Sequence, residues 1–349
     1  MFSKSNLKAL IVILSGLALV LVVLNLKRPD VVKYQKAQIF DQSSGDTLSE
    51  TRLLDEQPLF IPVKLTSKKI VDFQINNENK GIVYVDENGT IEGVSFDGKD
   101  RKVIRKADKP VSEAIWSVGG SSLIERFGFG SAPRYFRTSD KVSTNLHPAI
   151  KFITFSLSGD KIAYHFFEDQ KEEGNLAISD PDGGNYRIIY KTKISALNLF
   201  WSQNNKLFFY PTNKEDATDL FSLNIDGSDF KKIMPNISDP NIFWSKDGNS
   251  YLISYKADSK EKFELRSQDG GLVKTFSVFG VSSCLWSLND KSVFCGRDGE
   301  IGKLNLETGE YQTIVTFSLK PIKILVSSLE DILIIKNSDD SLYSIKIEK

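Results

Sequence analysis

Short runs of apolar residues recur along most of this chain, and most of them end in an aromatic residue followed by serine. The gaps between successive copies are 42, 39, 46, 43, 42 and 40 residues. The residues at the aromatic position, which is degraded in the first and last copies, are Gln74, Trp116, Phe155, Trp201, Trp244, Trp286 and Val326. A period near forty residues that holds several short strands is typical of a β-propeller, in which each repeat forms one blade.

Residues 239–276 show how one repeat predicts one blade. The apolar run that ends at Trp244 is followed by Asp247-Gly248, a dipeptide typical of a hairpin turn, and by a second apolar run. Two further alternating runs are separated by Asp269-Gly270. The pattern predicts an all-β, seven-bladed β-propeller of four-stranded blades. The repeat after Ala114 fits least well, because its third turn has no glycine.

The last repeat has residues for only three strands, whereas an unassigned apolar run, residues 59–65, precedes the first repeat. We predict that this run is the outer strand of the last blade and closes the ring, since closure removes exposed strand edges. Pro62 is compatible with an edge strand. The open alternative is a packed linker. The predicted propeller domain spans residues 58–349.

A membrane segment is predicted near the start of the chain. Residues 9–26 are 18 uncharged residues between Lys8 and Lys27, and a helix of this length covers about 27 Å, close to the thickness of a hydrocarbon core. We predict an uncleaved transmembrane signal anchor, with a cytoplasmic tail at 1–8 and a flexible tether at 27–57. A signal peptide cut at an unobvious site and a buried soluble helix are the alternatives.

The length of the amino-terminal tail decides the predicted orientation. Positive charge is slightly denser after the apolar run than before it, but large domains cross membranes largely regardless of charge, and so short a tail usually stays inside. We therefore expect a single-pass membrane protein with the propeller on the extracytoplasmic side.

Composition narrows the possible functions. With 45 basic and 45 acidic side chains the net charge is zero, so no broad attraction to nucleic acid is encoded. Two His and two Cys are too few for a zinc cluster of the usual spacing. Residues 180–185 carry spaced carboxylates like part of a calcium loop but lack the distal Glu, which favours a turn. No metal, cofactor or catalytic motif is predicted.

Two cysteines, Cys284 and Cys295, flank a predicted turn symmetrically. An antiparallel hairpin centred between Asn289 and Asp290 makes them direct neighbours across the two strands. An extracytoplasmic compartment permits a disulfide there, and two buried thiols are an equally ordinary alternative.

Two sets of side chains are candidates for binding. The repeated tryptophans could stack sugars or bases, but a ring that recurs once per blade favours packing between neighbouring blades; they are Trp116, Trp201, Trp244 and Trp286. In the second blade, cations alternate with aromatic residues and could meet an anionic or carbohydrate ligand. That patch consists of Arg126, Arg134, Arg137, Phe129 and Tyr135. The alternative for the patch is a solvated strand face.

Two segments carry a family resemblance. Residues 243–248, Phe-Trp-Ser-Lys-Asp-Gly, and 223–228, Leu-Asn-Ile-Asp-Gly-Ser, resemble the WD-like propeller repeats of TolB-type proteins. The likeness covers residues 58–349 at the level of the fold and implies an extracytoplasmic, six- or seven-bladed interaction module. An anchor and a tether replace the amino-terminal α/β domain of TolB, so membership of its envelope complex is not implied.

We predict that the chain is not an enzyme but a non-catalytic binding or scaffolding module for another envelope protein or polymer. The reason is that the blade-building residues are complete and no catalytic constellation is left over. The alternative is a glycan-binding or glycan-cleaving propeller enzyme with a site at the central channel, using carboxylates such as Asp160, Asp247 or Asp290. These three fall at equivalent turns, which favours a structural role. The oligomeric state and the ring face that binds are not encoded.

Overall fold

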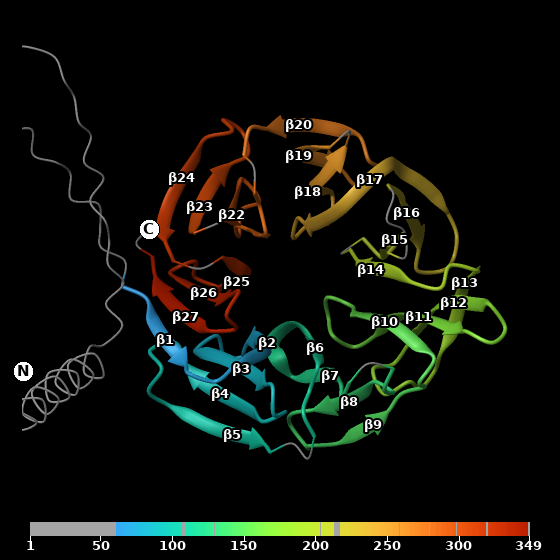
Figure 1. The fold of residues 1–349 in the computed structure, drawn as a ribbon, viewed down its shortest axis with the longest axis horizontal. Helices are drawn as coiled ribbons and strands as arrows, with labels where there is room; N and C mark the ends of the chain where they lie inside the picture. Colours follow the sequence, from blue (N-terminus) through green and yellow to red (C-terminus); the bar gives the residue numbers. More distant parts are fainter. Residues whose placement is uncertain are drawn as a thin grey trace, which may run out of the picture. The chain divides into compact units, whose positions relative to one another are not determined.

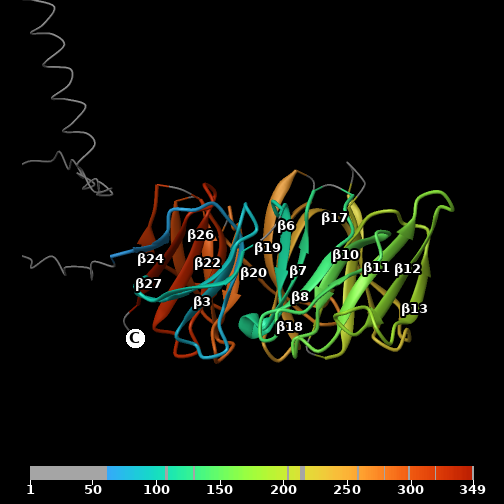
Figure 2. The ribbon, with the colours of Figure 1, turned by 90° about the horizontal axis from the view of Figure 1, so that it is seen from below.

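The computed structural model describes residues 61–106, 109–128, 130–202, 204–212, 217–257, 259–278, 280–297, 299–318 and 320–347. Their antiparallel strands form a closed ring (Figure 1), and Figure 2 shows the strands running between its two faces. Within the described residues the helical structure is limited to the 3₁₀ turn η1 (Val118–Gly120). The all-β class and the propeller architecture are therefore confirmed.

The strands fall into units of four, joined by hairpins. The first unit contains β2 (Ile70–Ile75), β3 (Gly81–Asp86), β4 (Ile91–Ser95) and β5 (Arg101–Arg105); the second, β6 (Glu113–Trp116), β7 (Ser122–Arg126), β8 (Arg134–Arg137) and β9 (Ser143–Asn145); the third, β10 (Ile150–Phe155), β11 (Ile162–Glu168), β12 (Glu173–Ser179) and β13 (Arg187–Thr192). First strands of neighbouring units contact one another, as in the pairs β2–β6 and β10–β14 (Leu197–Trp201). The first strands therefore form the inner side of the ring.

The fourth and fifth units share one strand. Their strands are β14 (Leu197–Trp201), β15 (Lys206–Pro211), β16 (Thr218–Asn224), β17 (Lys231–Trp244), β18 (Ser250–Ala257), β19 (Lys260–Ser267) and β20 (Leu272–Phe276). The first part of β17 pairs with β16 and the second part with β18, so the two units merge into one seven-stranded sheet. Asn236 and Asp239, with φ of 55° and 49°, interrupt the extended backbone within this long strand.

The last units complete the ring. The sixth contains β21 (Ser283–Trp286), β22 (Ser292–Arg297), β23 (Glu300–Asn305) and β24 (Tyr311–Thr316), and the seventh contains β25 (Pro321–Val326), β26 (Ile332–Asn337) and β27 (Leu342–Lys346). The fourth strand of the seventh unit is β1 (Val63–Thr66), which pairs with β27. Five four-stranded sheets and the shared seven-stranded sheet thus provide seven units. The strand begins at Val63, after Pro62, so proline does not interrupt the pairing.

The serine that recurs in every full repeat closes the first hairpin of its unit. The Ser245 hydroxyl accepts a hydrogen bond from the N–H of Ser250 (3.0 Å) and donates to the Asp247 carboxylate (2.6 Å). Four equivalent hydroxyls likewise accept from the N–H five residues later, and they belong to Ser117, Ser156, Ser287 and Ser327. All five serines are buried. A small side chain that both accepts and donates explains why serine recurs at this position.

The glycine of the third turn is required for a different reason. Gly227 and Gly270 adopt φ of 90° and 86°, which residues with a Cβ rarely do. A Cβ at these positions would lie 2.4 Å from the Ile189 carbonyl oxygen and 2.5 Å from the Ile233 carbonyl oxygen. Each contact is with the outer strand of the preceding unit, so these turns let neighbouring units approach closely.

The four repeated tryptophans pack against the unit before their own. Trp286 donates its ring N–H to the Phe243 carbonyl of the fifth unit (2.8 Å), and the Trp244 ring lies 4.1 Å from that of Phe208 in the fourth. Trp116 and Trp201 join the apolar clusters between units one and two and between units three and four. The ring N–H groups of Trp116 and Trp244 have no hydrogen-bond partner among the described residues. Packing, rather than ligand stacking, therefore accounts for the tryptophans.

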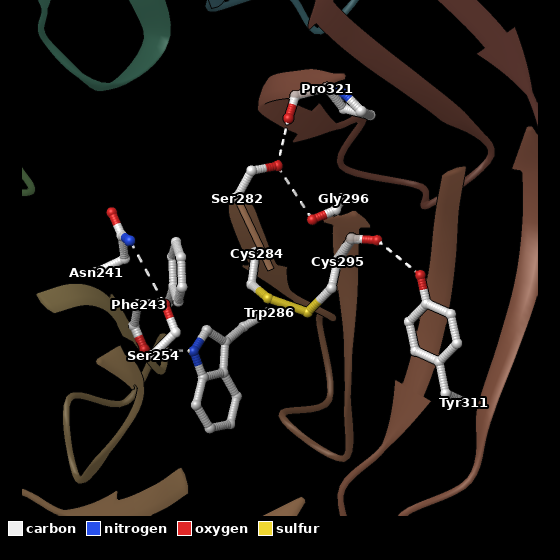
Figure 3. The surroundings of a disulfide bond; sticks show 10 residues. All are labelled: Asn241, Phe243, Ser254, Ser282, Cys284, Trp286, Cys295, Gly296, Tyr311 and Pro321. Carbon is white, nitrogen blue, oxygen red and sulfur yellow. Dashed lines mark hydrogen bonds between the residues drawn. A yellow bond between two sulfur atoms is a disulfide. The ribbon is translucent and has the colours of Figure 1, made fainter. Parts of the chain in front are cut away.

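Cys284 and Cys295 face each other across β21 and β22. Their Cα atoms are 4.2 Å apart, and a disulfide joins the two side chains (Figure 3). Both residues are buried in the same cluster as Trp286. The bond therefore links two strands of one unit, beside the contact between the fifth and sixth units.

The predicted tail, anchor and tether, residues 1–57, lie outside the described residues, as do residue 58 of the predicted propeller domain and residues 59–60 of the predicted closing run. In the part of the chain that is described, no helix is both long and apolar enough to cross a bilayer.

Replacing Leu65 tests how much the ring depends on its closing strand. Leu65 is completely buried in a cluster that joins the first and seventh units. Because its truncation leaves a cavity at the seam, we expect Leu65→Ala to lower the free energy of unfolding by about 2–5 kcal/mol in urea titrations of the full chain. Val103→Ala, a surface control at 51 % exposure, should change it by less than about 0.5 kcal/mol. Equal effects of the two changes would contradict a stabilising seam.

Candidate functional site

A pocket of about 560 Å³ lies on the inner side of the ring, where the second, third and fourth units meet. Its walls include residues 113–115 on β6, 150–153 on β10 and Asn198 on β14, together with loop residues such as Asp169. We call it the inner pocket. Its lining combines apolar side chains with both acidic and basic groups, which is typical of ligand sites.

Arg126 and Glu113 form the first charged pair of the inner pocket. The Arg126 Nε lies 3.3 Å from the Glu113 carboxylate, and the remaining guanidinium nitrogens donate to the carbonyls of Ser131 (3.0 Å), Ile150 (2.8 Å) and Lys151 (2.7 Å). Burial lowers the pKa of Arg126, although arginine stays charged at neutral pH. Arg126 therefore holds the second and third units together and leaves the Glu113 carboxylate, which is 71 % exposed, facing solvent.

Lys151 and Asp169 form the second pair. The Lys151 Nζ lies 2.7 Å from an Asp169 carboxylate oxygen, and the two side chains are 33 % and 71 % exposed. Exposed ion pairs of this kind contribute little to folding stability. An incoming carboxylate can therefore replace Asp169 at the lysine with little loss of stability.

The predicted patch of the second blade does not form one surface; its members are Arg126, Arg134, Arg137, Phe129 and Tyr135. Arg134 donates to the buried Glu125 (2.8 Å), Tyr135 is buried, and Arg137 pairs with Asp140 (2.8 Å). Phe129 lies outside the described residues. Of the described members, Arg126 alone borders the inner pocket.

The buried Glu125 explains why the patch contains so many arginines. Arg105 of the first unit and Arg134 approach its carboxylate to 2.6 Å and 2.8 Å. The Arg105 guanidinium lies 4.3 Å from the Phe136 ring centroid, and that of Arg134 lies 4.2 Å from the centroid of Phe127. This group of charges joins the first two units, and removing one member would leave a buried charge unpaired.

Three aspartates were candidates for chemistry at a central channel, and they are Asp160, Asp247 and Asp290. Hydrogen bonds from the hydroxyls of Ser158 and Ser156 lower the pKa of Asp160, and a bond from Ser245 does the same for Asp247. Asp290 accepts from the Lys246 N–H of the preceding unit (3.3 Å). The carboxylates of Asp160 and Asp247 therefore stabilise turns, and that of Asp290 links the sixth unit to the fifth. The loop at residues 180–185 is also a turn, because Asp180 is held by Lys161 and by the side-chain amide of Asn185 (2.6 Å).

Sequence reasoning did not identify Glu113, Lys151 or Asp169. Each is a charged residue at the end of a strand or in a loop, and no motif or spacing distinguishes it from many similar residues. The second repeat gave a weak indication of the pocket, because it fits the repeat pattern least well and contributes residues to the pocket wall.

The two histidines lie on opposite faces of the third unit. The His147 ring packs on Phe166 with centroids 5.0 Å apart, whereas His165 is the neighbour of Phe166 on β11 and points to the other face. His165 is completely buried, and neither ring nitrogen has a hydrogen-bond partner among the described residues. Burial is the main reason that its pKa falls to about 4; the nearby Ile194 carbonyl opposes the shift and Lys151 adds to it.

Comparisons with known proteins give a fold and no family. No family model matches the chain, and neither does any curated protein sequence. Among solved structures, an oligogalacturonate lyase from Vibrio parahaemolyticus aligns with a TM-score of 0.66 at 11 % identity, over 84 % of this chain and 96 % of that one. An oligogalacturonate lyase in complex with manganese aligns with a TM-score of 0.64 at 9 % identity, over 83 % and 96 %. At these identities the likeness shows the propeller fold, and the TolB-type resemblance has no support from a family model.

The prediction of a non-catalytic binding or scaffolding module was wrong, and so was the prediction that the chain is not an enzyme. Both rested on the argument that a complete propeller leaves nothing for catalysis. The alignment covers 96 % of the lyase chain, so in that protein an enzyme is built from this fold with almost nothing added. A complete propeller therefore does not exclude catalysis.

The described residues do not fit a manganese site, whereas the second neighbour was solved in complex with manganese. Manganese prefers carboxylate, carbonyl and water oxygens as ligands. Among the described residues no three His, Cys, Asp or Glu side chains converge in a way that could hold a metal. We therefore derive no step through a metal ion.

Burial of His165 predicts a pH-dependent stability. Its pKa is about 4 in the folded chain and ordinarily 6.5, so the unfolded chain binds the extra proton between these values. The contribution of the neutral ring is complete above pH 6.5 and is lost as the pH falls toward 4, with a slope of at most about 1.4 kcal/mol per pH unit. Urea titrations at several pH values should show a flatter profile for His165→Leu than for the wild type, while the surface control Val103→Ala, which removes no titratable group, should keep the wild-type slope. Identical profiles for wild type and His165→Leu would disprove this assignment.

Proposed function

We propose that this chain is a carbohydrate-active propeller that binds an acidic oligosaccharide in the inner pocket and cleaves it by elimination. The proposal rests on two ion pairs at the pocket, Glu113 with Arg126 and Asp169 with Lys151. In each of them the carboxylate is exposed and the cation is more buried. The similarity of the fold to oligogalacturonate lyases supports the choice of an acidic sugar as substrate.

Lys151 is the group that we assign to the carboxylate of the sugar. Its side chain is partly exposed, and its partner Asp169 is mostly in solvent. Arg126 is unsuited to the same task, because three of its donors are committed to backbone carbonyls. It acts as a positioning residue for Glu113. Phe152, partly buried in the wall, presents an apolar surface to the sugar ring.

Elimination in a uronic acid begins at the carbon next to the carboxylate. A cation bound to the carboxylate stabilises the negative charge that develops when this carbon loses its proton. We assign Glu113 to accept the proton. The electrons of the C–H bond form a carbon–carbon double bond, the glycosidic C–O bond breaks, and water protonates the departing oxygen.

Purified full-length protein incubated with oligogalacturonate tests this function. The unsaturated product absorbs ultraviolet light, which follows cleavage, and calorimetry measures binding separately. We expect Glu113→Gln to lower kcat by about 10²-fold or more with binding retained, as for loss of a general base. Lys151→Ala should weaken binding by about tenfold or more, since a charged hydrogen bond is lost, whereas Lys232→Ala, in another exposed ion pair, should change neither. Absence of both binding and cleavage for all uronate oligosaccharides tried would overturn the proposal.

We also propose that residues 9–26 anchor the chain in a membrane with the propeller on the extracytoplasmic side. The uncharged run supports the anchor, and a disulfide is compatible with an oxidising compartment. Membrane fractionation and protease treatment of intact cells should find the full chain in membranes and the propeller accessible from outside. A chain without residues 9–26 should be released from membranes; a propeller protected in intact cells would contradict the orientation.

The relation of the blades to TolB-type repeats also remains a proposal. The motifs at 243–248 and 223–228 support it. It concerns the repeat alone and assigns no partner to this chain.

A further inference from the structure

A second hollow, of about 470 Å³, adjoins the inner pocket. It lies between the end of β9 in the second unit and the strands β10 to β13 of the third, and we call it the rim groove. Ile150, at the start of β10, borders both the rim groove and the inner pocket. The two hollows are therefore neighbours on either side of one residue.

The rim groove exists because the second unit is too small to cover the third. Its strands β8 and β9 have four and three residues, whereas β11 and β12 have seven each. Part of the apolar face of the third unit consequently has no neighbour to pack against. Tyr186 and Ile188, which border the groove, are 67 % and 47 % exposed.

The equivalent position in the next unit is also exposed, at 44 %, but its ring is stacked on another ring. Phe230 occupies the same place, four residues after the aspartate of the third turn, and the Tyr190 ring stacks on it at 4.9 Å with an interplanar angle of 6°. Among the described residues no aromatic ring stacks on Tyr186. An aromatic side chain that is exposed at a groove and on which no other ring stacks is suited to bind a ligand.

The chemistry of the rim groove fits a sugar. Tyr164, Phe166 and Tyr186 provide aromatic surfaces, on which the C–H faces of a pyranose can pack. Asn175 and Asp182 lie among them and offer an amide and a carboxylate to the hydroxyl groups. No lysine or arginine borders the groove within the described residues. The groove therefore favours the uncharged faces of sugar rings, in contrast to the inner pocket with its two cations.

We propose that the rim groove holds the distal part of the same oligosaccharide whose reacting residue lies in the inner pocket. The inference rests on the proposed function and deepens it, because it makes the preferred substrate an oligomer rather than a disaccharide. The shared border of the two hollows at Ile150 carries the argument. Contacts far from the reacting bond then raise the affinity for long substrates without taking part in the chemistry.

Substrate length provides the test. We expect Tyr186→Ala to raise KM for a galacturonate hexasaccharide by roughly five- to tenfold, the loss typical of one aromatic contact, and to leave the disaccharide unchanged. Tyr186→Phe should keep most of the preference for the longer substrate, since the ring remains. Phe230→Ala, the matched aromatic at the equivalent turn, should alter the preference for neither substrate. Unchanged thermal unfolding of Tyr186→Ala would show that the fold is intact.

Two results would overturn the inference. They also distinguish a failure of the rim groove from a failure of the proposed function. If Tyr186→Ala alters KM for both lengths equally, or for neither, while cleavage still depends on Glu113, then the rim groove does not bind substrate and the proposed function stands. If no uronate oligosaccharide of either length binds or is cleaved, the proposed function fails and the extended site fails with it. A protein partner seated on Tyr186 would produce the first of these results.

Discussion

Packing between neighbouring units, completed by one strand from the opposite end of the described chain, is the interaction on which the rest of this structure depends. A four-stranded sheet exposes two faces, and here each face is covered only by the next unit. At the seam, β1 pairs with β27, and Leu65 fills the cluster that joins the first and seventh units. The Lys323 Nζ lies 2.7 Å from the Asp72 carboxylate across the same junction. Without these contacts two sheets would be left with open edges and uncovered faces.

The polar groups of the closed ring fall into two classes according to their interaction partners. In the first hairpins, serine hydroxyls and turn carboxylates satisfy backbone N–H groups and one another, so that their hydrogen-bonding capacity is used within the fold. Around the inner pocket, by contrast, the carboxylates of Glu113 and Asp169 face solvent. Hydrogen bonding within a turn, rather than exposure or residue type, distinguishes structural carboxylates such as the exposed Asp160 from the carboxylates that pair with cations at the pocket.

The second unit is where the repeat is least regular and where both hollows open. Its short outer strands leave part of the third unit uncovered, and the group formed by Glu125, Arg105 and Arg134 replaces apolar contact with charge at its junction with the first unit. Departures of this kind from the regular pattern commonly coincide with functional sites. The imperfect fit of this repeat therefore has a physical meaning, since full-length strands would fill the space that a ligand needs.

The sequence by itself determined the strand pattern, the number of units and the closing segment. These follow from local rules: alternation of side chains, turn dipeptides, and a serine and an aromatic residue that most units carry at the same place. It also placed Cys284 opposite Cys295, because register in a short hairpin follows from the turn. The merging of two units through β17 was not predictable, since it depends on how the two sheets are oriented. Likewise, only the tertiary structure decided which charged residues stabilise the fold and which line a pocket. Arg134 and Glu125 belong to one buried group. Glu113, Lys151 and Asp169 come from strands and loops of two units and line the inner pocket. Such a meeting is set by the packing of units that are distant in sequence, and no local pattern of residues records it.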